Sequence, residues 1–349
     1  MRKLLLSFWL IIILIATISA LTSCNIKDVS LPVDYEVDEP FESVSIDIYT
    51  ADIDIFLTDE EIVRVSTHDS KRMYHSVTVK DGVLTIEFVD DRQWFDYIFN
   101  SGSENNIAVY LPDAIYSALV VDASTGHVHI DGIRFESIDI ELSTGDVELY
   151  SSSAESININ ASTGDIMASN LIANNINIQS TTGRINVADI ECESITAKAS
   201  TGSIVIGEIN ADGAISAETT SGNISIVEAK SGSLSLDATT GDCLLSSIKC
   251  ESVAASCGTG DIVLDSVIAK GVIDIDATSG DVDLAYSDAK EIYIDTTTGN
   301  VSGTLLSGKK FEVKSTTGQK DIPASDRLTE DICRIETTTG DITVSIMED

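Results

Sequence analysis

The 349-residue chain contains 57 aspartate and glutamate residues against 21 lysine and arginine residues, which gives a net charge of −36. This balance argues against nucleic-acid binding, which depends on lysine and arginine at phosphates, and against attraction to anionic lipid headgroups. Cations, cationic surfaces, neutral glycans and other proteins remain as partners, although outward carboxylates also simply keep a long sheet soluble.

The first residues predict an exported lipoprotein. Arg2 and Lys3 precede an apolar run over residues 4–21, and Leu-Thr-Ser-Cys closes the segment at Cys24. A charged start, an apolar core and small residues before a cleavage point are typical of a secretory signal peptide, here residues 1–23. The closing residues resemble a bacterial lipobox, which implies that Cys24 is lipidated and anchors the chain to the outer face of a membrane. A plain transmembrane anchor is the alternative, because the run is just long enough to span a bilayer.

Two segments precede the repeats. Residues 24–40 are polar, acidic and contain two prolines, so we interpret them as a tether. Residues 41–120 are predicted to form an N-terminal β cap. The cap includes a first, degenerate coil at residues 44–55, with Ala51 where later coils carry glycine. Such a cap is expected because solenoids need atypical terminal units that cover their exposed edge.

Two further signals lie inside the predicted cap. Residues 80–83, Lys-Asp-Gly-Val, are a hairpin signal between two strand-like runs. Downstream, four aromatic residues gather in a short stretch, and we expect them to pack over the open end of the stack: Trp94, Phe95, Tyr97 and Phe99.

Residues 121–349 repeat one phrase every 19 or 20 residues, with a final interval of 22. Positions seven and five before a recurring glycine, and two and four after it, are apolar, whereas the positions between them are polar. This alternation predicts two strands per coil with one buried face, joined by a Ser/Thr-Thr-Gly turn and by a second bend near residues 211–213. The structural turn glycines are Gly126, Gly145, Gly164, Gly183, Gly202, Gly222, Gly241, Gly260, Gly280, Gly299, Gly318 and Gly340.

The repeats predict the fold class. One repeat cannot bury its own apolar face, but stacked repeats can. Identical positions then lie about 4.8 Å apart in neighbouring coils. The chain is therefore predicted to be an all-β protein, a parallel β-solenoid of about twelve coils with an N-terminal β cap. Right-handed coiling is favoured, because β-crossover connections are overwhelmingly right-handed.

Several phrases carry a family resemblance. The opening Val-Ser-Ile-Asp-Ile of residues 44–48, the hairpin at residues 80–86, Val-Tyr-Leu-Pro at residues 109–112 and the serial Ser-Thr-Gly-Asp-Ile resemble the bacterial putative-adhesin family. The resemblance covers roughly residues 40–349. It implies an exported β-solenoid, and it brings no catalytic residues, because the family has none established.

A column of aspartates follows the glycines. Asp242, Asp261 and Asp281 fall on consecutive coils, so their carboxylates are expected to stack. At about 4.8 Å each neighbouring pair repels by about 1 kcal/mol in a water-like dielectric. Such a column invites Ca²⁺, which takes several oxygen ligands. The alternative is that each aspartate is a turn residue that accepts backbone hydrogen bonds.

Two histidines form a second candidate metal site. His127 and His129 alternate outward just after Gly126, and Asp146 and Glu148 occupy the same two positions one coil later. Two imidazoles beside two carboxylates are suited to a zinc-like ion. The alternative is an ordinary solvated face, because nothing in the sequence orients the rings.

Five cysteines follow Cys24. Cys243 and Cys257 lie in positions predicted to be buried, where cysteine usually acts as a small hydrophobic residue. A disulfide between these two stays open as an alternative. Cys192 and Cys250 share one position three coils apart, which is too far for a bond.

The sequence predicts no catalytic residues. Serines recur in every coil, as structural turn residues would, and no nucleophile elbow is present. Asp274 and Asp276 resemble the acid pair of a glycosidase, but similar acids populate most coils. Lys198 and Lys314 lie in outward positions and are expected to have no companions.

The sequence therefore predicts a non-catalytic, lipid-anchored surface protein that presents an acidic, repeated β-sheet face to a glycan or protein partner. No cofactor is expected apart from the possible calcium. One alternative is an accessory protein of envelope stress or signalling, which rests on the family resemblance alone. The other is a polysaccharide-active β-helix enzyme, which rests on fold analogy.

Overall fold

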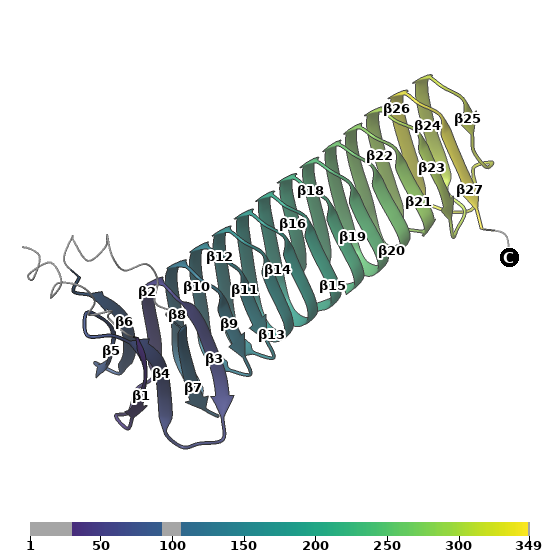
Figure 1. The fold of residues 1–349 in the computed structure, drawn as a ribbon. Coiled ribbons are helices and arrows are strands. Elements are labelled where there is room, and N and C mark those ends of the chain that lie inside the picture. Colours follow the sequence, from purple (N-terminus) through teal and green to yellow (C-terminus); the bar gives the residue numbers. More distant parts are fainter. Residues whose placement is uncertain (1–29, 93–105, 348–349) are drawn as a thin grey trace, which may run out of the picture.

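The computed structural model describes residues 30–92 and 106–347. The predicted signal peptide, Cys24 and the aromatic stretch at residues 94–99 lie outside these residues. Within the described ranges every regular element is a β-strand, and the strands stack into a straight rod (Figure 1). The predicted parallel β-solenoid of about twelve coils is confirmed. No helix in these ranges is long and apolar enough to span a membrane.

The strands of the rod pair in parallel with the equivalent strand one coil later. β13 pairs with β14 in register from Ile166↔Ile185 to Thr182↔Thr201. Because the register is constant, the aliphatic side chains at equivalent positions stack along the rod and stay buried in its interior. The rod strands before β20 are β8 (Ile115–Thr125), β9 (Val128–Asp131), β10 (Arg134–Thr144), β11 (Val147–Tyr150), β12 (Ser153–Thr163), β13 (Ile166–Thr182), β14 (Ile185–Thr201), β15 (Ile204–Ala211), β16 (Ala214–Ser221), β17 (Ile224–Lys230), β18 (Ser233–Thr240) and β19 (Cys243–Thr259).

Each central coil has three corners, one more than predicted. In the coil that begins at Gly164 the buried side chains fall into three groups: Ile166 and Ala168, then Leu171 and Ala173, then Ile176, Ile178 and Ser180. Residues within a group are two apart and successive groups are an odd number of residues apart, so the inward face changes parity at every corner. The added corner lies six residues after the glycine, where eight coils place a residue other than glycine at positive φ, between +49° and +58°: Ser151, Asn170, Asp189, Glu208, Glu228, Ser247, Ser266 and Tyr286.

The N-terminal end is closed by antiparallel strands. β1 (Leu31–Val37) pairs with β4 (Val63–Asp69), which in turn pairs with β7 (Asn106–Pro112). β5 (Met73–Lys80) and β6 (Val83–Asp90) form the predicted hairpin, with Asp81 at φ +52° and Gly82 at φ +79°. These strands cover the apolar end of the stack (Figure 1).

The first coil of the sequence lies one layer below this closure. β2 (Ser43–Thr50) and β3 (Asp52–Thr58) form a coil around Ala51. β2 pairs in parallel with β8 on one side and β6 on the other, and β3 pairs likewise with β9 and β7. Ala51 is absent from the residues at positive φ, unlike most of the turn glycines.

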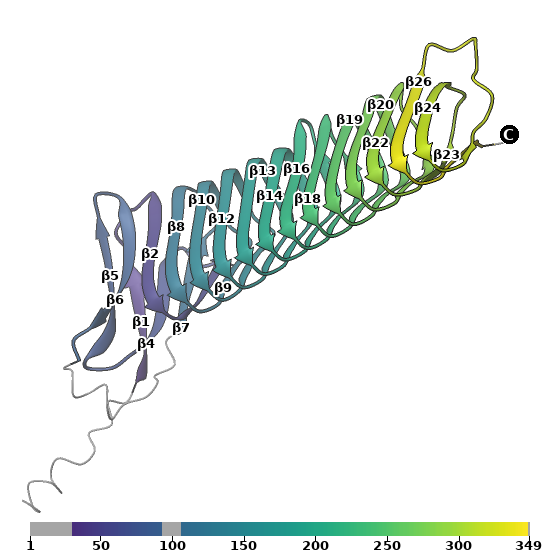
Figure 2. The same ribbon diagram turned by 90° about the horizontal axis from the view of Figure 1, so that it is seen from above.

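At the C-terminal end the order of the last two coils is reversed, which corrects the expectation of sequential stacking. β26 pairs with β22 on one side and β24 on the other, so the last coil lies between its two predecessors (Figure 2). β27 is likewise between β23 and β25. The strands of this end are β20 (Ile262–Ser279), β21 (Val282–Ser287), β22 (Glu291–Thr298), β23 (Val301–Leu305), β24 (Lys310–Thr317), β25 (Lys320–Asp321), β26 (Ile332–Thr339) and β27 (Ile342–Ile346).

This reversal makes β24 the exposed edge strand. Its side chains include Lys310, Glu312 and Lys314, which are the kind of charges that discourage edge-to-edge pairing. Each forms an ion pair with a neighbouring chain segment: Lys310 with Glu330, Glu312 with Arg334 and Lys314 with Glu336.

Candidate functional site

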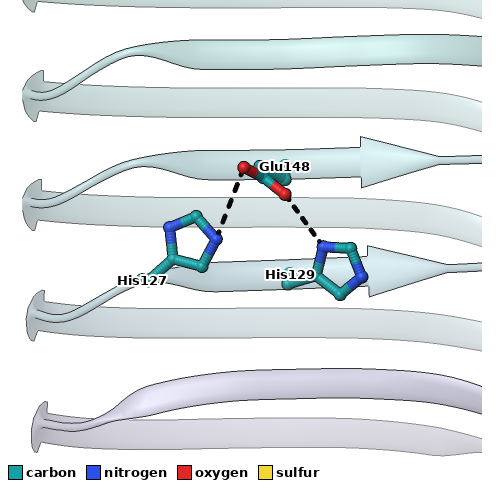
Figure 3. A group of neighbouring side chains, drawn as sticks. All are labelled: His127, His129 and Glu148. Carbon is teal, nitrogen blue, oxygen red and sulfur yellow. Dashed lines mark hydrogen bonds and ion pairs between the residues drawn. The ribbon is translucent and has the colours of Figure 1, made fainter.

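His127, His129 and Glu148 form a cluster near the N-terminal end of the rod. His129 on β9 lies directly beside Glu148 on β11 in the parallel register. His129 Nδ1 is 3.1 Å from Glu148 Oε2, and His127 Nε2 is 3.7 Å from Glu148 Oε1. The carboxylate therefore lies between the two imidazoles, one coil above them (Figure 3). All three side chains are partly exposed, so the cluster is accessible from solvent.

Aromatic side chains orient one of the rings, which the sequence did not indicate. The His129 imidazole lies between Phe56 of β3 and Tyr150 of β11, with ring centroids 5.5 and 5.7 Å away. Contacts on both sides restrict the ring. Burial, followed by the charge of Glu148, raises the pKa of Tyr150. The His129 side chain itself is 24% exposed, so its surroundings are drier than those of a fully exposed surface residue.

Asp146, the fourth predicted member of this group, has another contact. Its Oδ1 accepts a hydrogen bond from the backbone N–H of Asp165 at 2.7 Å. The structure thus brings together three of the four residues. The fourth lies one coil from His127 in the column of residues that follow the turn glycines, and this column has a role of its own.

In most coils the side chain of the residue after the turn glycine accepts a hydrogen bond from the backbone N–H of the equivalent residue in the neighbouring coil, and these bonds form a ladder. Asp242 Oδ1 accepts from the N–H of Asp261 at 3.0 Å, and Asp261 Oδ1 accepts from the N–H of Asp281 at 2.8 Å. Asp281 in turn accepts from the N–H of Asn300 at 2.7 Å. This is the turn role that the sequence offered as the alternative. The calcium site at these aspartates stays a prediction.

A shallow polar groove crosses six successive coils beside the glycine corner. It encloses ≈ 600 Å³ and follows the positions four, three and two residues before the glycine. Small residues such as Ala161 and Ala199 form its floor. Its polar walls are Asp122, Glu141, Asn160, Gln179, Lys198, Glu218, Ser143, Ser162, Thr181, Ser200 and Thr220.

The outward lysines have partners, which corrects the sequence-based expectation. Lys198 Nζ lies 2.7 Å from Glu218 Oε2 within the groove, and Lys314 Nζ lies 3.2 Å from Glu336 Oε2 at the edge coil. Both partners come from the coil stacked next to the lysine. Residues at the same distance from their turn glycines face each other in neighbouring coils. The pairs could therefore have been predicted from the alignment of the repeats on glycine, although only the register of the strands establishes them.

The five cysteines of the described residues are buried and free. Burial is the main cause that raises the pKa of Cys243 and Cys333 to about 12, and that of Cys192 and Cys250 to about 11. Protonated, buried thiols are inert. Their positions support the interpretation of cysteine as a small core residue.

Two polar clusters were not found from the sequence. In the cap, Tyr35 Oη donates to Asp69 Oδ2 at 2.7 Å, and Asp69 Oδ1 lies 2.7 Å from His75 Nδ1. His75 is 1% exposed and its Nε2 has no hydrogen-bond partner among the described residues. Burial and the hydrogen bond to Asp69 raise the pKa of Tyr35 to about 12. The antiparallel pairing that joins these residues leaves no periodic signal in the sequence.

The second cluster lies at the C-terminal end. Lys309 is 1% exposed, and its Nζ is 2.6 Å from Asp288 Oδ1, 2.8 Å from Ser307 Oγ and 3.3 Å from Asp331 Oδ2. A buried ammonium needs such compensation. The cluster joins segments of three coils.

Comparisons with known proteins agree with the fold. The profile of the Toastrack DUF4097 family matches residues 41–243 and 227–349. No curated protein matches the sequence significantly.

Solved structures similar to this chain include a putative adhesin from Parabacteroides distasonis, 13% identical, covering 92% of this chain and 98% of its own, at a TM-score of 0.33. A putative lipid binding protein from the same species is 13% identical, with coverages of 91% and 97% and a TM-score of 0.28. A putative cell adhesion protein from Clostridium sporogenes is 9% identical, with coverages of 91% and 100% and a TM-score of 0.22. Similarities this distant carry no argument about function.

Proposed function

This chain belongs to the Toastrack DUF4097 family, and we propose that it is a non-catalytic binding module of the bacterial cell surface. In this proposal residues 1–23 direct export, Cys24 is lipidated, and residues 25–30 tether the rod to the membrane. The predicted tether of residues 24–40 is shortened in this way because Leu31–Val37 form strand β1 of the cap. β1 begins at Leu31 in the cap, so the tether leads to the capped end. About twelve coils at about 4.8 Å each place the far end some 60 Å away.

The polar groove beside the glycine corner is the observation that supports this function. It presents the same positions on successive coils, so a ligand with its own repeat can contact several coils in the same way. Amides and hydroxyls line its middle, at Asn160, Gln179, Ser162 and Thr181. These groups both donate and accept hydrogen bonds, as sugar hydroxyls do. We therefore propose a glycan as the ligand.

The negative charge of the chain disfavours anionic glycans as the ligand. The groove also contains Glu141 and Asp122, and the whole chain carries −36. An anionic polysaccharide would meet like charges along its length. A neutral or cationic glycan fits the groove better, and a protein ligand is the alternative outcome.

A glycan array probed with the full chain tests the proposal. We expect binding to a neutral or cationic glycan, and loss of that binding in the double variant Asn160→Ala/Gln179→Ala. Asn186→Ala is the matched control, because Asn186 is exposed and lies outside the groove lining. Binding that is equal in all three proteins would place the ligand elsewhere, and absence of any glycan signal with capture of a protein would favour the protein alternative.

The same samples separate binding from catalysis. A polysaccharide-active enzyme would shorten the bound glycan, as measured by chromatography of the products, and a pair of acids in the groove would then be required. We expect the glycan to be recovered intact. Acyl labelling of the chain and of Cys24→Ser tests the anchor separately, and label that persists in the variant would refute lipidation at Cys24.

A further inference from the structure

We propose that His127, His129 and Glu148 form a binding site for one divalent transition-metal ion of the zinc, copper or nickel class. The proposal concerns a site outside the glycan groove and is independent of it. Two imidazole nitrogens and one carboxylate oxygen are a donor set that suits these ions, whereas calcium and magnesium prefer oxygen ligands alone.

The distances fit a tetrahedral ion. With metal–ligand bonds of about 2.0–2.1 Å, two ligand atoms of a tetrahedron lie roughly 3.3 Å apart. The two observed separations between imidazole nitrogen and carboxylate oxygen, 3.1 and 3.7 Å, lie on either side of this value. One ligand atom from each residue can be chosen so that all three lie within 4.8 Å of one another. This limit exceeds the tetrahedral spacing, so binding requires side-chain rotations that bring the three donor atoms closer to one ion.

The backbone holds the three residues in place. His129 lies on β9 and His127 directly precedes that strand, two residues earlier, so the two side chains point to the same face. The parallel register sets Glu148 directly beside His129. Phe56 and Tyr150 limit the orientation of the His129 ring. Preorganised ligands lose less entropy when the ion binds.

Neighbouring carboxylates favour a cation here. Asp54 is the register partner of His129 on the other side, and Asp52 Oδ1 accepts from the N–H of His127 at 2.8 Å. The potential of these acids concentrates cations at the face. In the described part of the chain, this trio is the one group of three or more metal-binding side chains whose donor atoms come so close together. The remaining coordination positions face solvent.

Metal titration of the untagged, metal-stripped full chain tests the proposal. We expect one Zn²⁺, Ni²⁺ or Cu²⁺ per chain by calorimetry. We expect affinity to fall at least about tenfold in each of His127→Ala, His129→Ala and Glu148→Gln. His68→Ala is the matched control, because it removes a histidine of the cap that lies on another strand. Asp146→Asn keeps the ladder acceptor and should leave the affinity unchanged.

Copper spectroscopy supplies a readout that does not depend on affinity. The electron paramagnetic resonance spectrum of the Cu²⁺-loaded chain should show coupling to two imidazole nitrogens, and to one in His127→Ala. Melting curves recorded with a chelator establish that the variants fold. A stoichiometric site that survives in the double variant His127→Ala/His129→Ala would overturn the proposal, as would binding no stronger than that of calcium.

Discussion

The glycine at each corner is required mainly because successive coils approach too closely for a side chain. A Cβ at Gly202 would lie 1.8 Å from the carbonyl oxygen of Gly183, and φ at Gly202 is +151°. Two causes can require a glycine here, a positive φ and a close contact between coils, and Gly299 distinguishes them. Gly299 is absent from the residues at positive φ, yet a Cβ there would also lie 1.8 Å from the carbonyl oxygen of Gly280. The sequence attributed these glycines to turn conformation alone, whereas backbone contact between coils is the more general cause.

Gly202→Ala should therefore destabilise the rod strongly. The strained backbone costs on the order of 1–3 kcal/mol, and the contact with Gly183 adds to it. Gly207→Ala is the control on the same coil, because a Cβ there would meet nothing closer than 4.0 Å. We expect it to be neutral or slightly stabilising, since glycine weakens a strand interior. Urea unfolding measures both, and equal effects would refute the stacking explanation.

The aspartate ladder predicts opposite effects for two substitutions at Asp261. Asp261→Ala removes the acceptor for the N–H of Asp281 and should cost about 0.5–1.5 kcal/mol. Asp261→Asn keeps an acceptor oxygen and removes like-charge repulsion of about 1 kcal/mol, so it should be neutral or stabilising. Melting with and without calcium completes the test, because a calcium site would raise the wild-type melting temperature and leave Asp261→Asn unchanged.

The buried thiols predict a loss of stability in alkali. Their pKa values are raised, mainly by burial, from 9.0 to about 12 at Cys243. The unfolded chain therefore loses these protons first as the pH increases. The stabilising contribution is fully present below pH 9 and declines as the pH rises toward 12. Denaturant unfolding across this window should show a smaller decline for Cys243→Ala, and an identical decline would contradict the assignment.

At the scale of the element, the reversed coil order predicts where the C-terminal end opens. β26 has a hydrogen-bonded neighbour on each side, and Lys309 ties the segment before it to Asp288. β24 is paired on one side only, and its side chains are partly or fully exposed.

Hydrogen exchange followed by mass spectrometry should therefore show slow exchange in β26 and fast exchange in β24, although β26 is closer to the end of the chain. Lys309→Ala, which leaves two carboxylates without their cation, should accelerate exchange in both strands. Sequential fraying from residue 347 inward would contradict this order of events.

Some elements of the fold could be predicted from the sequence and others could not. The columns of buried aliphatic side chains were predictable because every coil repeats the same inward positions, so one alignment on glycine reveals them all. The third corner was not, because ordinary residues such as Asn170, Asp189 and Tyr286 adopt the positive φ there. The reversed coils were also missed, since the interval of 22 indicates an irregularity without showing where the strand pairs. At the candidate site, the repeat placed Glu148 beside the histidines, but the packing of Phe56 on His129 depends on the coil order near the cap.

At the scale of the whole molecule, charge repulsion along the rod predicts a response to salt. The chain carries −36, and equivalent acids on neighbouring coils lie about 4.8 Å apart. Raising sodium chloride from about 0.02 M to about 0.5 M shortens the Debye length from roughly 20 to roughly 4 Å and should raise the melting temperature. A fall in melting temperature would mean that the ion pairs at Lys198, Lys314 and similar residues outweigh the repulsion.

The first and last coils of the sequence each lie one layer beneath an end of the stack, and this fixes how such a protein can change in length. At the N-terminal end the first coil is covered by the antiparallel strands of the cap, and at the C-terminal end the last coil is covered by β24 and β25. New units must enter by duplication in the middle, where every unit meets the same neighbours. Each duplication would lengthen the rod by one strand spacing and leave both closures intact, so the distance between its two ends can be adjusted in evolution, or by design, one unit at a time.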